Sequence, residues 1–172
     1  HESDQFTLRP TEHGEWEAEL PLSAIKHGDK FKLRVYWPGG AGWRLPSYAT
    51  YVVQDDDSVD FSAVVWWPDQ PYQWRHDIPP APAVPLIYEA HVGMRSEKGE
   101  VASFDYFRTE VLPRIKKAGY NTVQLMAIAE HPYYGSFGYH VSNFFAVSSR
   151  FGTPDDFKRL VDEAHSLELR VI

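Results

Sequence analysis

Cysteine is absent from the chain, which excludes disulfide bonds and thiolate metal sites. This absence is compatible with a reducing compartment, and we predict a cytoplasmic location. No apolar run is long enough for a membrane span, and the first residues do not have the layout of a signal peptide. A starting methionine is also missing, so we expect residues 1–4 to come from a cut inside a longer chain or from added residues.

Basic residues are outnumbered, because 17 Lys and Arg face 24 Asp and Glu, for a net charge of −7. Neither a basic patch nor a basic helix is present, which argues against nucleic acid and against a membrane surface as partners. A neutral partner fits this charge better. Apolar and aromatic side chains are plentiful, at 43% and 15%, and 172 residues are enough for one domain or two small ones. We therefore predict a folded protein with a buried core.

The first half of the chain has the period of half-buried strands. In residues 15–20, and again in residues 30–37, apolar side chains alternate with charged ones. We predict that these two strands pair, because one outward row is acidic and the other is basic. Trp16 and Trp37 lie on the apolar faces, which favours positions in the core or at a domain interface.

Two further short strands are predicted at residues 48–53 and 62–67, separated by an acidic turn at residues 55–57. Short strands at this spacing are typical of an all-β sandwich. Residues 75–85 then form a proline-dense stretch, which cannot donate ladder hydrogen bonds and prefers an extended, semi-rigid form. We place the domain boundary there.

Beyond this boundary strands alternate with helices, which is typical of βαβ units and a parallel sheet. Strands are predicted at residues 86–92, 122–129 and 169–172. The first helix begins after Ser103, a good N-cap, and Pro113 should kink or restart it. The second helix has Thr153 as N-cap and Pro154 as its first residue. Glu168 stands where a left-handed C-cap is expected, at a cost of about 1 kcal/mol relative to glycine.

Residues 130–154, which we call the aromatic loop, connect the second of these strands to the second helix. Among glycines and serines the aromatic loop holds Tyr133, Tyr134, Phe137, Tyr139, Phe144, Phe145 and Phe151. Loops of this length are uncommon in compact domains and usually carry function. Two interpretations stay open: a functional loop, or an Ω-like loop whose aromatic rings pack on one another and on the body of the protein.

The order of residues here resembles a known family. The run YNTVQLMAIAEHPYYGSFGYHVSNFFAVSSRFGTPDDFKRLVDEAHSL resembles the second strand, loop and second helix of the catalytic barrel of 1,4-α-glucan (glycogen) branching enzymes, in glycoside hydrolase family 13. YEAHVG and VLPRIKKAGY are similar to the first strand and first helix of that barrel. GEWEAELPL, HGDKFKLRV and RLPSYATYVVQD resemble the family's carbohydrate-binding module of family 48. The match extends from about Gly14 onward.

The resemblance implies a multidomain β plus α/β fold. Residues 1–74 would be an immunoglobulin-like β-sandwich that lacks its first strand or two, and residues 75–85 the linker. Residues 86–172 would be the first β-α-β-α-β portion of a TIM (β/α)8 barrel, because a complete barrel needs about 250 residues. An open parallel sheet of this kind would expose the edge of its third strand, so we also expect self-association.

The activity that the resemblance implies is transfer of an α-1,4-glucan segment to a 6-hydroxyl, forming α-1,6 branches in glycogen by a retaining double displacement. No cofactor is needed, because carboxylates and positioning carry the chemistry. In the family the nucleophile Asp and the acid/base Glu follow the position of Ile172, so we expect no catalytic residue in this chain and no activity of the chain alone. The alternatives are a debranching or maltooligosyl-trehalose hydrolase and a non-catalytic glucan-binding protein.

Candidate substrate-binding residues follow from the loop and the resemblance together. A loop after the second barrel strand lies on the catalytic face, and the ring of Tyr139 offers a flat apolar surface to a sugar. The family places this tyrosine beside the sugar next to the cleaved bond. His140 shares the loop, and Glu130 and His131 are candidates that act mainly through hydrogen bonds to neighbouring residues.

Two tryptophans and four histidines complete the candidates. The family's module binds glucan through aromatic residues in the region of Trp16 and Trp37, which stands as an alternative to their core positions. The histidines have no ligand-type spacing, so no metal site is predicted; they are His91, His131, His140 and His165. The predicted partner is an α-glucan such as glycogen or amylose.

Overall fold

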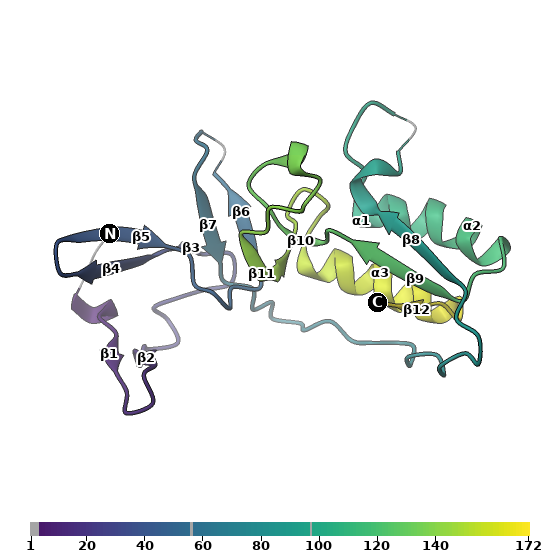
Figure 1. The fold of residues 1–172 in the computed structure, drawn as a ribbon. Helices are drawn as coiled ribbons and strands as arrows, with labels where there is room; N and C mark the ends of the chain where they lie inside the picture. Colours follow the sequence, from purple (N-terminus) through teal and green to yellow (C-terminus); the bar gives the residue numbers. More distant parts are fainter. Residues whose placement is uncertain (1–3, 56, 97) are drawn as a thin grey trace.

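The second half of the chain is built around a parallel three-stranded sheet in the computed structural model, which describes residues 4–55, 57–96 and 98–172. The strands lie in the order β12-β9-β8 and run in one direction (Figure 1). They span Ile87–His91 (β8), Thr122–Met126 (β9) and Arg170–Val171 (β12). The predicted parallel sheet is therefore confirmed.

Helices join these strands and share one buried core with them. The helical elements of this half are η2 (Val92–Met94), α1 (Phe104–Tyr106), the π-helical turn η3 (Phe107–Val111), α2 (Leu112–Lys117), η4 (Tyr134–Ser136) and α3 (Pro154–Ser166). Phe104, Leu112 and Leu160 from the helices pack with Val123 and Leu169 of the sheet region, all fully or almost fully buried. This core fixes the sheet edge on which the aromatic loop stands.

The first helical segment accommodates Pro113 by widening one turn. Ser103 caps its start, since the hydroxyl accepts from the backbone N–H of Tyr106. In the π-helical turn η3 the N–H of Leu112 donates to the carbonyl of Phe107, five residues back. α2 then restarts with Pro113 in its first turn, where the missing N–H removes no helical bond. The predicted interruption is confirmed.

α3 begins and ends as its sequence predicts. Thr153 and Asp156 form a capping box, in which each side chain accepts from the other's backbone N–H. Beyond the helix, Glu168 has a φ of +56°, the left-handed conformation expected there. The carboxylate of Glu168 pairs with Lys116 of α2 at 3.2 Å.

The first half consists of small antiparallel sheets. Its elements are η1 (Asp4–Phe6), β1 (Arg9–Pro10), β2 (Trp16–Glu17), β3 (Lys30–Phe31), β4 (Leu33–Trp37), β5 (Gly40–Arg44), β6 (Val52–Gln54) and β7 (Phe61–Val64). β3, β7 and β6 form one sheet, β4 and β5 a hairpin, and β1 and β2 a short pair. Residues 1–3, and Asp56 of the predicted acidic turn, lie outside the described residues.

The predicted pairing of residues 15–20 with residues 30–37 is wrong. β2 pairs with β1, while β3 pairs with β7 and β4 with β5. The basic row finds other carboxylates: Lys30 lies 2.9 Å from Asp55, and Lys32 lies within 4 Å of both Asp55 and Asp60. The lysines thus form ion pairs with Asp55 and Asp60, and not with the glutamates of residues 15–19 as predicted.

The predicted core positions of Trp16 and Trp37 are also wrong. Their side chains are 65% and 44% exposed. The buried core of this half is small, centred on Ala49, Val52 and Ala63, and neither tryptophan reaches it. Alternation along a strand shows which side chains share a face, but burial depends on whether another layer covers that face.

The predicted linker is extended but is held against the second half. Between β7 and β8, residues 65–86 contain no helix or strand. Asp162 of α3, with no exposed surface, accepts hydrogen bonds from Tyr72 (2.7 Å), from the side chain and backbone of Arg75, and from His76. Burial alone would raise the pKa of Asp162, but these hydrogen bonds hold it well below its usual range. Asp162 therefore fixes the middle of the connection, residues 72–76, to α3.

Candidate functional site

The aromatic loop stands beyond the carboxyl ends of β8 and β9. It continues from β10 (Ala129–Glu130) and returns as β11 (Asn143–Val147), which pairs antiparallel with β10 (Figure 1). The predicted strand over residues 122–129 does not run through, because Ala127 adopts a left-handed φ of +55° and β9 ends at Met126. In a parallel α/β sheet the carboxyl edge is where ligands bind.

Glu130 forms a buried ion pair that closes the base of the loop. Its carboxylate accepts from the backbone N–H of Ser149 at 2.7 Å and of His131 at 3.0 Å, and it lies 3.2 Å from the guanidinium of Arg150. Arg150 also donates to the carbonyl oxygens of His131 and Pro132. Both ends of the loop are thus tied together around one carboxylate.

His131 lies beside this ion pair and is equally buried. Its Nδ1 atom lies 3.0 Å from the carbonyl oxygen of Ala129, and its ring packs against Tyr134 and Phe151. Neither Glu130 nor His131 has exposed surface. Glu130 and His131 therefore hold the base of the loop in place and do not face solvent.

Tyr139 and His140 are exposed on the loop, and the Tyr139 side chain is 67% exposed. Just before them Phe137 and Gly138 form a left-handed pair, with φ of +53° and +83°. The backbone N–H of Tyr139 donates to the carbonyl of Ser136 at 3.0 Å. An exposed ring on a well-bonded turn combines a flat apolar face with a hydroxyl, the combination that suits a sugar.

The aromatic residues of the loop divide into a buried and an exposed set, with Tyr134 half-buried between them. Phe151 is buried and meets the rings of Phe104 and His91, each at 5.7 Å between centroids. The exposed set consists of Tyr133, Phe137, Tyr139, Phe144 and Phe145. The Ω-like interpretation accounts for Phe151 and in part for Phe137 and Phe145, whose rings meet those of His91 and Tyr48. Within the described residues it leaves Tyr133, Tyr139 and Phe144 without such a ring contact.

Trp37 offers a second flat surface, at a distance from the loop. Its ring lies over the glycines of β5: a Cβ added to Gly40 or Gly42 would come within 3.3 or 3.1 Å of the ring. The guanidinium of Arg44 lies 5.3 Å from the ring centroid. In Figure 1, β2 and β4, the strands that contain Trp16 and Trp37, lie to the left of β7 and β6, whereas β10 and β11 lie to their right. The two tryptophan-bearing strands are therefore separated from the strands that flank the turn of the aromatic loop.

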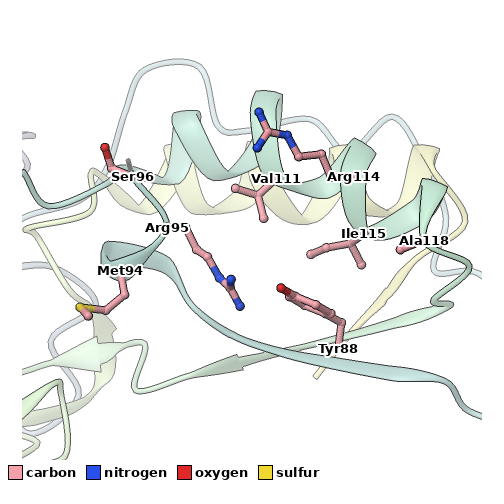
Figure 2. Close-up of a pocket in the computed structure, with 8 residues that line it drawn as sticks. All are labelled: Tyr88, Met94, Arg95, Ser96, Val111, Arg114, Ile115 and Ala118. Atoms are coloured by element: carbon pink, nitrogen blue, oxygen red, sulfur yellow. The ribbon is translucent and has the colours of Figure 1, made fainter. Parts of the chain in front are cut away.

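A pocket of about 400 Å³ lies between β8 and α2 (Figure 2). Tyr88 and Arg95 point into it from the strand side, with the guanidinium 5.0 Å from the Tyr88 ring centroid, and Ile115 faces them from the helix. No predicted site residue lines this pocket, and its β8 wall belongs to an edge strand. We do not assign the predicted glucan site to it.

Among residues 4–55, 57–96 and 98–172, no cluster of three or more histidine, cysteine, aspartate or glutamate side chains has the arrangement of a metal site. In the same residues no helix is long and apolar enough to cross a membrane.

Known proteins resemble this chain over nearly its whole length. The family of the alpha-amylase catalytic domain matches residues 108–172. A 1,4-alpha-glucan-branching enzyme of Yarrowia lipolytica is 46% identical over 98% of the chain, and that of Equus caballus 42% over 97%. A chloroplastic/amyloplastic 1,4-alpha-glucan-branching enzyme of Oryza sativa is 52% identical over 87%. This chain belongs to the branching-enzyme family.

The chain spans about a fifth to a quarter of the length of these branching enzymes, at 26%, 25% and 19% of the three. A solved structure, a putative alpha amylase from Salmonella typhimurium, superimposes with a TM-score of 0.71 at 23% identity, covering 96% of this chain and 26% of that one. At this identity the likeness concerns the fold alone. The alpha-amylase type of fold in this branching-enzyme chain is thereby supported independently.

Sequence reasoning missed two residues of the site in the branching-enzyme chain. Arg150 was not singled out, although Glu130 and Arg150 are the only Asp, Glu, Lys or Arg side chains between residues 130 and 150. Two isolated opposite charges in an aromatic loop are a usable signal for a buried pair. His91, which contacts the loop, is one of the histidines for which the sequence predicts no metal site, and it is not among the predicted site residues.

Proposed function

We propose that this chain is part of a 1,4-alpha-glucan branching enzyme. The enzyme transfers an α-1,4-glucan segment to a 6-hydroxyl and so forms α-1,6 branches in glycogen by a retaining double displacement. The identity to branching enzymes over nearly the whole chain supports this proposal. The net charge of −7 agrees with a neutral polysaccharide as partner.

We propose a finer architecture on the same basis. Residues 86–172 supply the first strands and helices of a TIM (β/α)8 barrel, a proposal supported by the parallel order β12-β9-β8. Residues 1–74 correspond to an incomplete immunoglobulin-like module of carbohydrate-binding family 48, joined by residues 75–85. The antiparallel sheets of the first half support this assignment.

Tyr139 is the residue on which the proposal chiefly rests. Its exposed ring, on a turn beyond the carboxyl ends of the parallel strands, forms one wall of the glucan cleft and stacks against a sugar ring. His140, exposed beside it, contributes polar contacts. Glu130 and His131 act indirectly, by holding the base of the loop.

We assign no catalytic residue to this chain. Retaining glycosyl transfer needs two carboxyl groups about 5–5.5 Å apart, one that bonds to the sugar and one that moves the proton. The carboxylate of the aromatic loop, Glu130, is fully buried in its ion pair with Arg150. It is therefore unavailable for attack on a sugar. The proposed mechanism requires no cofactor, since carboxylates supply the nucleophile and the acid.

The decisive variant is Tyr139→Ala in the full-length protein. We expect kcat/KM on amylose to fall by about tenfold or more, because the stacking contact of the aromatic ring with the sugar is lost. Branching is measured by the change in absorbance of the iodine–amylose complex. Tyr133→Ala is the matched control, since Tyr133 belongs to the same loop and is also 67% exposed. Equal activity of the wild type and the Tyr139→Ala variant would remove the basis of the proposal.

A second candidate function, glucan binding without catalysis, is favoured by the Trp37 surface. A tryptophan ring that lies over glycines and is 44% exposed can stack on a sugar, and Trp16, 65% exposed, offers another exposed ring. Trp37→Ala should then weaken retention on immobilised amylose. If the full-length protein binds amylose but never alters its iodine complex, this binding function replaces the enzymatic one.

We also propose the cytoplasm as the compartment, on the complete lack of cysteine. The rice relative is chloroplastic/amyloplastic by name. Fractionation of source cells with antibodies against the chain separates the two compartments.

A further inference from the structure

His91, the last residue of β8, reaches across to the aromatic loop. Its Nε2 atom lies 3.0 Å from the carbonyl oxygen of Phe137, 46 residues further along the chain. A carbonyl oxygen only accepts, so Nε2 carries the hydrogen and donates it. In the neutral ring Nδ1 is then an acceptor, and this buried atom has no hydrogen-bond partner among the residues described.

The imidazole of His91 is fixed on several sides. The residue is 6% exposed, and the rings of Tyr134, Phe137 and Phe151 meet it edge-on with centroids 6.3, 6.3 and 5.7 Å away. Burial lowers the pKa of His91. At neutral pH the ring is therefore uncharged and held in the tautomer that donates from Nε2.

The acceptor of this hydrogen bond belongs to the turn that carries Tyr139. Phe137 is left-handed, a conformation that a side chain other than glycine adopts only when its surroundings hold it there. Its own N–H donates to the carbonyl of Tyr134 at 2.8 Å. Gly138 follows, also left-handed, and is pressed so closely on Ala127 that an added Cβ would lie 2.5 Å from the Ala127 carbonyl oxygen. The turn has little freedom once Phe137 is held.

We propose that His91 is a positioning residue for Tyr139. By donating to the Phe137 carbonyl, it ties the left-handed turn to the end of β8 and sets the direction in which the Tyr139 ring faces the glucan. His91 itself is buried and touches no substrate. The inference rests on the proposed role of Tyr139 in glucan binding.

Two substitutions in the full-length protein test where the donor must lie. In His91→Gln the amide nitrogen reaches about the place of Nε2, whereas in His91→Asn it falls short, at the place of Nδ1. We expect H91Q to keep kcat/KM on amylose within about twofold and H91N to lose about 5–10-fold, the effect of one lost hydrogen bond. Val92→Ala is the control, because Val92 is the adjacent residue and is fully buried in the core. It should lower the melting temperature without changing kcat/KM.

A double-mutant cycle shows whether His91 acts through Tyr139. In the Tyr139→Ala background, H91N should cause no further loss, since no ring remains to be positioned. Hydrogen–deuterium exchange of the loop amides should quicken in H91N and stay at the wild-type rate in H91Q.

Each contrary outcome has a separate meaning. If the losses of H91N and Tyr139→Ala multiply, His91 does not act through Tyr139 and the positioning role is wrong. If kcat/KM falls as far in H91Q as in H91N, a hydrogen-bond donor at the Nε2 position is not what positions the loop. Where H91N does not fold, kcat/KM of H91Q compared with that of the wild type decides the question. If Tyr139→Ala alone leaves kcat/KM unchanged, the proposed function fails first and the positioning role fails with it.

Discussion

Gly93 shows how closely single residues are fitted where β8 meets the aromatic loop. It lies two residues after His91, and a Cβ added to it would lie 2.7 Å from a ring carbon of Phe151 and 2.8 Å from the hydroxyl oxygen of Tyr134. Real Cβ atoms essentially never come this close to other heavy atoms, so a larger residue must push the loop away. The need for glycine here comes from space and not from backbone conformation.

Gly93→Ala should therefore destabilise the protein by about 1–3 kcal/mol through overpacking. Chemical denaturation followed by tryptophan fluorescence measures the change in the free energy of unfolding. Gly99→Ala is the matched control, because nothing lies within 4 Å of a Cβ added there. If the two alanine variants are equally stable, the loop is not packed on Gly93 as described.

Among the elements, α3 carries two features whose energetic effects can be separated. Its C-terminal end requires Glu168 in the left-handed region, while the Glu168 carboxylate pairs with Lys116. The first effect is unfavourable for any residue with a Cβ, and the second is a weakly favourable surface pair. The two can be measured apart with two substitutions.

Glu168→Gly should stabilise the protein by about 0.5–1 kcal/mol, because glycine adopts this φ without strain. Glu168→Ala loses the same ion pair but keeps the strained backbone, so it should be no more stable than the wild type. Thermal and urea unfolding of both variants give the difference. A Glu168→Gly variant no more stable than Glu168→Ala would contradict the strain.

The buried face of α3 also makes stability depend on pH through Asp162. The folded-state pKa of Asp162 is lowered from the ordinary 3.8, so its contribution to stability is complete above about pH 4 and is lost as the pH falls further. Asp162→Asn should cost about 2–3 kcal/mol at pH 7, because donors from Tyr72, Arg75 and His76 lose a charged acceptor.

The check is urea denaturation between pH 7 and pH 2. The difference in unfolding free energy between the wild type and Asp162→Asn should shrink as the pH drops below 4. A difference that stays constant over this range would mean that Asp162 does not titrate abnormally in the folded state. Asp57→Asn, at an exposed position in the first half, serves as the control for replacing a carboxylate by an amide.

At the level of the whole molecule, the two halves of the chain share an interface. β11 of the loop contacts β6, Tyr48 stacks on Phe145 with centroids 4.8 Å apart, and the indole N–H of Trp66 donates to Asp155 at 3.3 Å. Together with Asp162 these contacts hold the first half against α3 and the loop. The orientation of the aromatic loop therefore depends on both halves.

The parallel sheet has open edges on β8 and β12 within the residues described. Arg170 and Ile172 donate to carbonyls of Asn121 and Val123, so the N–H of Val171 between them points to the open side. Unpaired strand edges template association. The 172-residue chain produced alone, 19.8 kDa as a monomer, should elute as larger species in size-exclusion chromatography with light scattering.

Val171→Pro removes the outward N–H without cutting a bond to β9, and should reduce this association. A wild-type chain that runs as a monodisperse monomer contradicts the prediction. Association that Val171→Pro leaves unchanged would place the contact elsewhere than on β12.

Local sequence signals determined much of this protein. The caps at Ser103 and Thr153, the interruption at Pro113 and the left-handed position of Glu168 were all predictable. Each depends on backbone groups within about five residues, so the physics of the short segment settles it. The order of residues in the aromatic loop likewise sufficed to indicate the branching-enzyme family.

Only the tertiary structure decided what is distant in sequence or depends on covering layers. It alone shows that Lys30 pairs with Asp55, that Trp16 and Trp37 are exposed, and that Glu130 is buried. Hydrophobic alternation predicts neither the ion pair nor the burial of these side chains, because both depend on which segments fold back over a face of the strand. The contact of His91 with the loop belongs here as well, since 46 residues separate donor and acceptor.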